Sequence, residues 1–135
     1  MGRDVLLDTG PLVAVLNRRD EWHDRVAAVW PEVIGRCVTT EAVLTEATHL
    51  VSEAPVLPLE FLLRARIPIL ALGLQHYRHC AVLMRRYADL PMDFADATLV
   101  TLSDVLDCDR VFTTDRRGFA AYRKANGERF ELIPS

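Results

Sequence analysis

Short apolar runs alternate with longer amphipathic segments along the chain. The short runs are bounded by Asp, Gly, Pro or polar clusters, a pattern that favours buried β-strands. They predict strands at residues 5–7, 37–40, 69–72 and 111–113, with a final edge strand at 130–133.

The longer segments carry apolar residues at the spacing of one helix face. The clearest stripe consists of Met92, Ala95, Leu99, Leu102 and Leu106. Asp93 stands just before the helix that carries this stripe, where an N-cap is expected. The predicted helices begin at about residue 12 and then cover residues 21–33, 41–53, 58–66, 74–88 and 93–106.

Strands therefore alternate with helices, which predicts an α/β fold built of βαβ units around a parallel sheet with helices on both faces. The length of 135 residues predicts one domain over residues 1–135. Ligands of such sheets bind beyond the carboxyl ends of the strands. Asp8 and Asp115 each follow a predicted strand, which makes this edge the first place to expect a site.

The charge balance does not by itself favour nucleic-acid binding. Lys and Arg together number 16 against 19 Asp and Glu, a net charge of −3. However, Lys124 is the only lysine, and the remaining 15 basic residues are Arg, whose planar fork suits bidentate contacts with phosphate. If several acids bind metal ions together, the remaining surface is more basic than the net charge indicates.

The cysteines and the apolar runs predict a cytoplasmic protein. Cys37, Cys80 and Cys108 are odd in number and form no C-x-x-C pair, which argues against a disulfide framework or zinc knuckle. Asp8 and Pro11 interrupt the first apolar stretch, so it makes a poor signal peptide. The longest apolar run is far shorter than the ~20 residues that span a membrane, so no membrane association is expected.

Four acidic residues occupy positions that favour a shared cleft. Asp8 and Asp115 end predicted strands, Glu46 borders the apolar face of its helix, and Asp96 lies nearer the apolar stripe than Asp93. Each also has an ordinary structural explanation. Asp8 and Asp93 suit helix caps, Glu46 suits the rim of a buried face, and Asp115 suits a solvated turn.

Carboxylates that meet in one cleft repel one another strongly unless cations or protons intervene. Ligation by oxygen atoms alone selects Mg²⁺ or Mn²⁺ over Zn²⁺. Such hard cations in turn bind and polarise phosphates. The acids together therefore predict a divalent-metal site that acts on a phosphate ester.

Four short motifs, in their order and spacing, resemble those of PIN-domain ribonucleases, most closely the VapC-type toxins of bacterial toxin–antitoxin pairs. The motifs are Leu6-Leu7-Asp8-Thr9, Thr45-Glu46-Ala47, Phe94-Ala95-Asp96-Ala97 and Phe112-Thr113-Thr114-Asp115. The resemblance covers essentially the whole chain, and no acidic position of the pattern is missing. It implies a PIN-like α/β/α sandwich with a central parallel sheet of about five strands.

The resemblance also implies an endoribonuclease that depends on Mg²⁺ or Mn²⁺ and cleaves RNA phosphodiester bonds with a metal-activated water. The residues that match the metal-binding, catalytic acids are Asp8, Glu46, Asp96 and Asp115. Asp93 matches an additional catalytic acid of this subgroup. Thr113 matches a hydroxyl that could orient a carboxylate, and the hydroxyl of Thr9 stands beside the first acid.

Partners follow partly from the resemblance and partly from the residues. Arg116, Arg117 and Arg123 are candidates for binding RNA phosphates, although a solvated basic turn explains each equally well. The resemblance implies a cognate antitoxin that covers the cleft. Helix faces rich in Leu, Val and Ala favour a homodimer. A PIN-like module that binds RNA or protein without catalysis remains the alternative, against which the intact acids argue.

Overall fold

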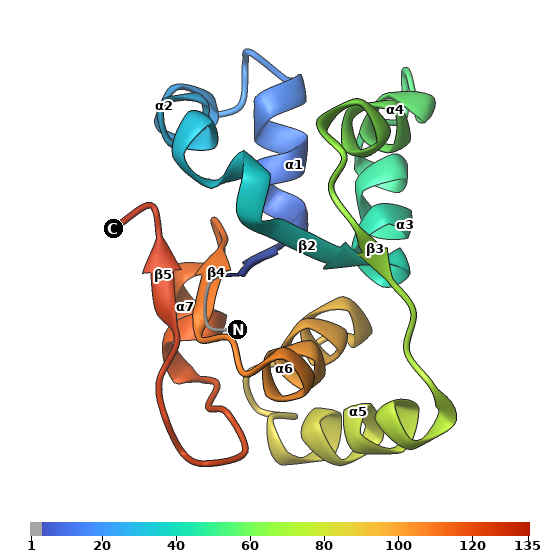
Figure 1. The fold of residues 1–135 in the computed structure, drawn as a ribbon, viewed down its shortest axis with the longest axis vertical. Helices are drawn as coiled ribbons and strands as arrows, with labels where there is room; N and C mark the ends of the chain where they lie inside the picture. Colours follow the sequence, from blue (N-terminus) through green and yellow to red (C-terminus); the bar gives the residue numbers. More distant parts are fainter. Residues whose placement is uncertain (1–3) are drawn as a thin grey trace.

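Five short strands form one parallel sheet in the computed structural model, which describes residues 4–135 (Figure 1). In chain order they are β1 (Val5–Leu7), β2 (Cys37–Thr40), β3 (Ile69–Leu70), β4 (Arg110–Phe112) and β5 (Glu131–Ile133). Their order in the sheet is β3-β2-β1-β4-β5, and every neighbouring pair is parallel. The predicted parallel sheet is confirmed, and the strand order changes direction at β1.

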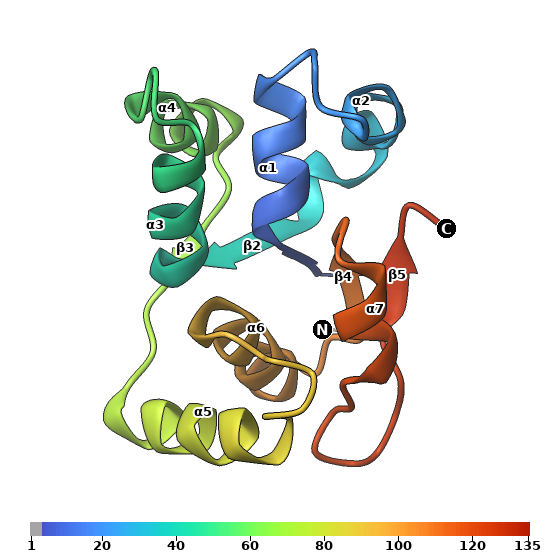
Figure 2. The same ribbon diagram turned by 180° about the vertical axis from the view of Figure 1, so that it is seen from behind.

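The helices cover both faces of this sheet (Figure 1). Figure 2, turned by 180°, shows the same division, with α1 to α4 on one side and α5 to α7 on the other. No helix within residues 4–135 is long and apolar enough to cross a membrane. The helices are α1 (Thr9–Leu16), α2 (His23–Val33), the 3-10 turn η1 (Ile34–Arg36), α3 (Glu41–Leu50), α4 (Val56–Ala65), α5 (Leu74–Arg86), α6 (Phe94–Leu106) and α7 (Arg116–Ala121).

The sheet separates two hydrophobic cores, and successive strand residues alternate between them. Leu6 of β1 packs into the core under α5 to α7, whereas Val5 and Leu7 pack into the core under α1 to α4. Trp30 fills the second core and meets the ring of Phe112 edge to face at 5.0 Å. A strand buried on both faces must be apolar throughout, which explains the unbroken run at β1.

The structure differs from the expected elements in several places, and the two that bear on the site are α1 and α7. Helix α1 begins at Thr9 rather than near residue 12, because Pro11 in a first turn removes an N–H that has no helical partner anyway. Helix α7 was not expected, since its six residues include Gly118 and look like a basic turn. Its stability comes from packing, because Phe119 is fully buried in the core.

The carboxyl ends of the strands are fixed by hydrogen bonds that continue past the strands themselves. The N–H of Asp8 donates to the carbonyl of Phe112 at 3.0 Å, and the N–H of Thr113 donates to that of Ile133 at 3.0 Å. Asp8 and Thr113 therefore lie at the same edge of the sheet, directly after β1 and β4. These are the neighbouring strands at which the strand order changes direction. This is the edge at which parallel α/β sheets bind ligands.

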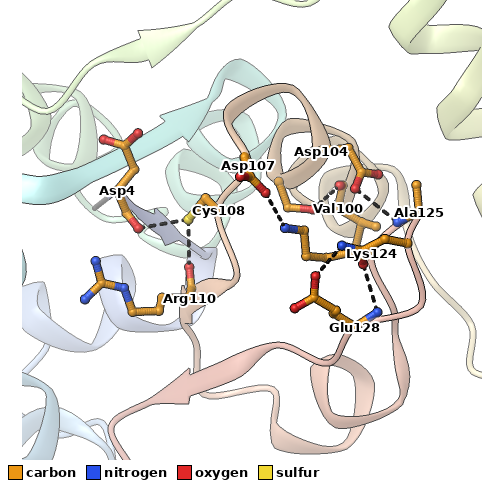
Figure 3. Close-up of polar contacts among 11 residues, drawn as sticks. Asp4, Val100, Asp104, Asp107, Cys108, Arg110, Lys124, Ala125 and Glu128 are labelled. Carbon is orange, nitrogen blue, oxygen red and sulfur yellow. Dashed lines mark hydrogen bonds and ion pairs between the residues drawn. The ribbon is translucent and has the colours of Figure 1, made fainter. Parts of the chain in front are cut away.

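The chain after α7 is fastened to the C-terminal end of α6 (Figure 3). Lys124 is only 6% exposed, and its Nζ donates to Oδ1 of Asp107 at 3.0 Å. The N–H of Ala125 donates to Oδ1 of Asp104 at 3.0 Å. These contacts hold the far end of the helix whose first turn carries Asp96.

We expect Lys124→Met to lower the free energy of unfolding by about 1 kcal/mol, because Asp107 is largely exposed and water weakens its ion pair. Urea unfolding measures the change. Asp107→Asn and the double variant complete a mutant cycle that isolates the pair. Zero coupling in this cycle would show that Lys124 acts through packing alone.

Candidate active site

Asp8 is nearly fully buried at the end of β1 and is held by Thr113. Its Oδ2 accepts a hydrogen bond of 2.7 Å from the hydroxyl of Thr113, and its side chain makes no capping bond to α1. Asp8 thus occupies the N-cap position of α1, as expected, but its carboxylate is held by Thr113. The same hydroxyl accepts the backbone N–H of Asp115 at 2.8 Å. One buried threonine thus joins two acidic residues from β1 and the start of α7.

Asp115 is exposed and caps α7, with its Oδ1 accepting the N–H of Gly118 at 3.1 Å. A Cβ at Gly118 would lie 2.6 Å from Oδ2 of Asp115 and 3.0 Å from the Tyr122 hydroxyl. Glycine is therefore required here by the close approach of a carboxylate and a phenol. We did not identify Gly118 from the sequence, where the only signal is a glycine three residues after an acid that follows a strand.

Asp93 and Asp96 cap the start of α6 reciprocally. Oδ1 of Asp93 accepts the N–H of Asp96 at 2.8 Å, and Oδ2 of Asp96 accepts the N–H of Asp93 at 3.3 Å. Asp96 is half-buried and Asp93 is exposed, in agreement with their helical spacing from the apolar stripe. The buried phenol of Tyr122 donates to Oδ2 of Asp96 at 3.3 Å. No pattern in the sequence indicated that Tyr122 belongs to the site.

Glu46 lies half-buried on α3 and approaches the same edge from another side. Its Oε1 accepts a short hydrogen bond of 2.6 Å from the hydroxyl of Thr9, the first residue of α1. Burial raises the pKa of Glu46, the Thr9 hydroxyl opposes this, and the nearby charge of Asp93 raises the pKa further. Glu46 therefore joins α3 to α1 and faces the acids of α6.

The pKa values show that the acids interact with one another. Burial raises the pKa of Asp8 to about 6; the Thr113 hydrogen bond opposes this rise, and the charges of Asp115 and Glu46 add to it. Burial also raises the pKa of Asp96 to about 8, and the charges of Asp8 and Asp93 contribute. The four acids and Asp93 consequently behave as one electrostatic cluster.

Little positive charge from the protein offsets this cluster. The ion pairs seen within residues 4–135, His79–Asp104 and Lys124–Asp107, involve none of its acids. Helices α1, α6 and α7 begin beside its acids, and their N-terminal dipoles supply partial positive charge. Protons or a bound cation must provide the remaining compensation.

The donor atoms fit a hard divalent cation. Carboxylate oxygens are the ligands that Mg²⁺ and Mn²⁺ prefer, and the cluster offers no imidazole or thiol that would favour a softer metal. Within the part of the chain that the structure describes, no three His, Cys, Asp or Glu side chains already converge closely enough to enclose an ion. Mg²⁺ keeps several of its waters and needs only one or two direct carboxylate ligands, so such a cluster can still suit it.

Comparison with protein-family models matches residues 5–125 to the PIN domain. The chain belongs to the PIN domain family. It is similar to ribonuclease VapC26 of Mycobacterium tuberculosis, at 27% identity, with 96% of this chain and 100% of that protein covered. It is also similar to the crystal structure of Mycobacterium tuberculosis VapC20, a sarcin-ricin loop cleaving toxin, with a TM-score of 0.79 and 18% identity. That match covers 87% of this chain and 95% of the VapC20 chain, and it shows a shared fold.

The three arginines beside the PIN acids have different surroundings. Arg116 is half-buried, donates to the carbonyl of Pro134 and lies over the ring of Trp22, with one guanidinium nitrogen buried without a partner. Nη1 of Arg123 donates to three carbonyls at the C-terminal end of α7, which is a structural role. Arg117 is exposed, and no hydrogen bond or ion pair within residues 4–135 holds it.

We expect the metal-free PIN domain to lose stability as the pH rises from about 4 to about 8, the range between the unfolded and folded pKa values of Asp8 and Asp96. A carboxyl whose pKa is raised by folding binds its proton more tightly in the folded chain. This stabilisation is full below the unfolded pKa and is lost as the pH rises through about 6 for Asp8 and about 8 for Asp96. For Asp8 the loss is on the order of 3 kcal/mol.

Urea unfolding in EDTA across this pH range measures the effect. Asp8→Asn should remove the part of the loss between about pH 4 and pH 6, because its side chain does not titrate. Asp89→Asn, at an exposed position on the α5–α6 connection, is the matched control. If the free energy of unfolding changed with pH equally in both variants, Asp8 would not have the raised pKa described above.

Proposed function

We propose that this PIN domain is an endoribonuclease that requires Mg²⁺ or Mn²⁺ and hydrolyses RNA phosphodiester bonds. The observation that carries the proposal is the placement of Asp8, Glu46, Asp96 and Asp115 in one electrostatic cluster at the carboxyl edge of the sheet. Such a cluster is costly unless cations balance it. Its similarity to a protein named as a ribonuclease supports RNA as the substrate.

The residues that would hold the metal are Asp8, Glu46, Asp96 and Asp115. The chemistry that Mg²⁺ or Mn²⁺ supplies when bound is polarisation of phosphoryl oxygens and acidification of water. Carboxylates that are protonated in the metal-free protein would have to release their protons on binding. The raised pKa values of Asp8 and Asp96 therefore support metal binding that strengthens as the pH rises.

Each acid has a partner that fixes its orientation. Three hydroxyls donate to three carboxylates: Thr113 to Asp8, Thr9 to Glu46 and Tyr122 to Asp96. The backbone N–H of Gly118 does the same for Asp115. Because the donors are neutral, they orient the carboxylates without cancelling the negative charge that attracts a cation. Tyr122 and Thr9 thus belong to the positioning residues, together with Thr113.

The basic side chains next to the cluster support an RNA path along α7. Arg117 is exposed two residues after Asp115 and is free to contact a phosphate. Arg116 has one guanidinium nitrogen that is buried without a partner, so this side chain would have to turn outward to contact a phosphate. The guanidinium nitrogens of Arg123 other than Nη1 remain to contact a phosphate. We propose all three as phosphate contacts, with Arg117 making the largest contribution.

We further propose that the protein acts in the cytoplasm as the toxin of a toxin–antitoxin pair and forms a homodimer. The similarity to VapC26 and VapC20 supports the first part. Exposed apolar side chains on α4 support protein partners; they are Val56, Leu57, Leu59 and Leu63. A soluble protein exposes such a group most readily where another chain covers it.

We expect Asp8→Asn to abolish RNA cleavage while the protein stays folded. Its amide oxygen still accepts the Thr113 hydroxyl, and the loss of one charge relieves repulsion in the metal-free cluster. Cleavage of pooled tRNA and rRNA is measured with Mg²⁺, with Mn²⁺ and with EDTA, and circular dichroism follows thermal unfolding.

Wild-type cleavage that persists in EDTA or in the purified variant would contradict the proposed metal-dependent site. A wild type that cuts no RNA but binds Mn²⁺ in calorimetry would instead favour the non-catalytic binding module. A marked fall in the melting temperature of Asp8→Asn would show that Asp8 is structural.

We expect Gly118→Ala to lower the cleavage rate at least about tenfold, the effect of a small misplacement of a catalytic group. The new methyl group would displace the Asp115 carboxylate. Gly35→Ala is the matched control, because nothing lies within 4 Å of a Cβ at that position. Equal rates for the two variants would show that Asp115 need not occupy its present position.

A further inference from the structure

Two arginines from different helices meet over one aromatic ring beside the carboxylate cluster. The Cζ atom of Arg25, in the first turn of α2, lies 4.0 Å from the centre of the Trp22 ring, and that of Arg116, the first residue of α7, lies 5.6 Å from it. Both distances fall within the range of a cation–π contact. Because Arg116 directly follows Asp115, this Arg25–Trp22–Arg116 triad adjoins the proposed site of cleavage.

The protein does not balance the charges of the two guanidinium groups. Three acidic residues precede Arg25 in its own segment; they are Asp20, Glu21 and Asp24. In the part of the chain that the structure describes, however, neither guanidinium group lies within ion-pair distance of a carboxylate. Burial lowers the pKa of Arg116, and the charge of Arg25 lowers it further. Like charges held this close repel each other, and a bound anion would relieve the repulsion.

Arg116 lies inward, in a position that leaves its hydrogen-bonding capacity unfilled. One guanidinium nitrogen donates to the carbonyl of Pro134, whereas Nη1 is buried without a partner. Both ribbon views place the C-terminal end of the chain on the side of the molecule that carries α2 (Figures 1 and 2). A buried N–H without an acceptor is costly. Turning outward to an anion would give Nη1 an acceptor.

A cavity of about 600 Å³ joins the triad to the edge of the sheet that carries the acids. Its wall includes Trp22, Gly10 and Thr114. Gly10 belongs to the first turn of α1, and Thr114 directly precedes Asp115. This cavity is distinct from a larger one of about 800 Å³ that is bordered by α3, α5 and α6. A strand bound at the acids can therefore reach Trp22 along the surface.

The charges around the smaller cavity decide which part of an RNA strand lies where. Asp20 and Glu21 line it, so its interior repels a phosphate. Oδ1 of Asp20 also accepts the N–H of Trp22 at 2.8 Å, which fixes this carboxylate in the wall. The guanidinium groups over Trp22 attract the phosphate instead. An uncharged ribose or base suits the cavity itself.

We propose that Arg25 and Arg116, held by Trp22, bind one phosphate of the RNA strand beside the nucleotide that is cleaved. The inference rests on the proposed function and extends the RNA path from α7 to α2. Arg25 contacts the phosphate from its exposed position, and Arg116 turns outward to reach it. The planar fork of a guanidinium group matches two oxygens of a phosphate. Trp22 orients both arginines and is a positioning residue.

Continuity with the cluster favours RNA over an acidic protein segment as the source of the anion. Phosphates repeat along a strand whose scissile bond has to reach Asp8 and Asp115. Neighbouring phosphates therefore pass close to Arg116, which directly follows Asp115 in the chain. An acidic side chain of another protein has no such constraint on its position.

The first test measures RNA binding without cleavage. Fluorescence anisotropy follows a labelled single-stranded oligoribonucleotide of mixed sequence in EDTA, between about 50 and 200 mM KCl. We expect Arg25→Gln to raise the Kd about fivefold or more. It should also reduce the slope of log K against log salt by about 0.7, the value of one phosphate contact on a single strand. Arg64→Gln, the same charge change at an exposed position of α4, should do neither.

Two variants of Trp22 separate positioning of the arginines from packing. Trp22 packs against the core under α1 to α4, and both phenylalanine and leucine keep an apolar side chain there. Only phenylalanine keeps a ring face for the guanidinium groups. We expect Trp22→Phe to bind RNA within about twofold of the wild type and Trp22→Leu to lose about as much affinity as Arg25→Gln. Equal affinities of both variants and the wild type would contradict a positioning role, and circular dichroism checks that each is folded.

The second test links the triad to turnover. In Mn²⁺, with the same RNA, Arg25→Gln should raise KM about fivefold or more and leave kcat within about twofold of the wild type. The reason is that a contact away from the scissile bond is made equally in the bound substrate and in the transition state. Arg64→Gln should change neither constant. A fall in kcat with unchanged KM would contradict a phosphate contact outside the catalytic centre.

The outcomes separate this inference from the proposed function. Cleavage that Arg25→Gln leaves at the wild-type KM, together with an unchanged Kd and salt slope, overturns the phosphate site and leaves the ribonuclease intact. RNA binding that depends on Arg25, without cleavage of any RNA, supports the phosphate site and overturns the proposed function. Polyglutamate that competes with RNA on equal terms in the wild type makes the two arginines a site for an acidic protein segment and overturns their assignment to RNA.

Discussion

Repulsion among carboxylates at one edge of a parallel sheet is the constraint around which this molecule is organised. Asp8 is buried, and its pKa is raised to about 6 by burial and by the charges of Asp115 and Glu46. No packing advantage accounts for such an arrangement, because apolar side chains of similar size would fill the same space more favourably. The two hydrophobic cores on either side of the sheet supply the stability that offsets this cost, and the proposed function gives the charge a role in binding a cation.

The elements around the cluster limit this cost without removing its charge. Neutral hydroxyls hold three of the acids, and helices begin beside Asp8, Asp96 and Asp115 with their positive ends toward them. The absence of a side chain at Gly118 lets the Asp115 carboxylate approach closely enough to cap the first turn of α7. Had an arginine or lysine been placed among the acids instead, it would neutralise the site and compete with the metal.

A cavity next to the cluster shares two of its residues with the cluster. Glu46 and Asp93 interact with the other acids and also line the cavity, so α3 and α6 border both the cluster and the cavity.

The sequence by itself determined the alternation of strands and helices, the strand-end positions of Asp8 and Asp115, and the cap at Asp93, because these depend on patterns within a few residues. The tertiary structure alone decided the helical state of α7 and the partners of the acids. Thr113 meets Asp8 across 105 positions of the chain, Thr9 meets Glu46 across 37, and Tyr122 meets Asp96 across 26. Local helix and strand propensities carry no information about contacts between residues so far apart in the sequence. Only the packing of the sheet and its helices brings these side chains together, and it also decides that Arg123 caps a helix while Arg117 faces the solvent.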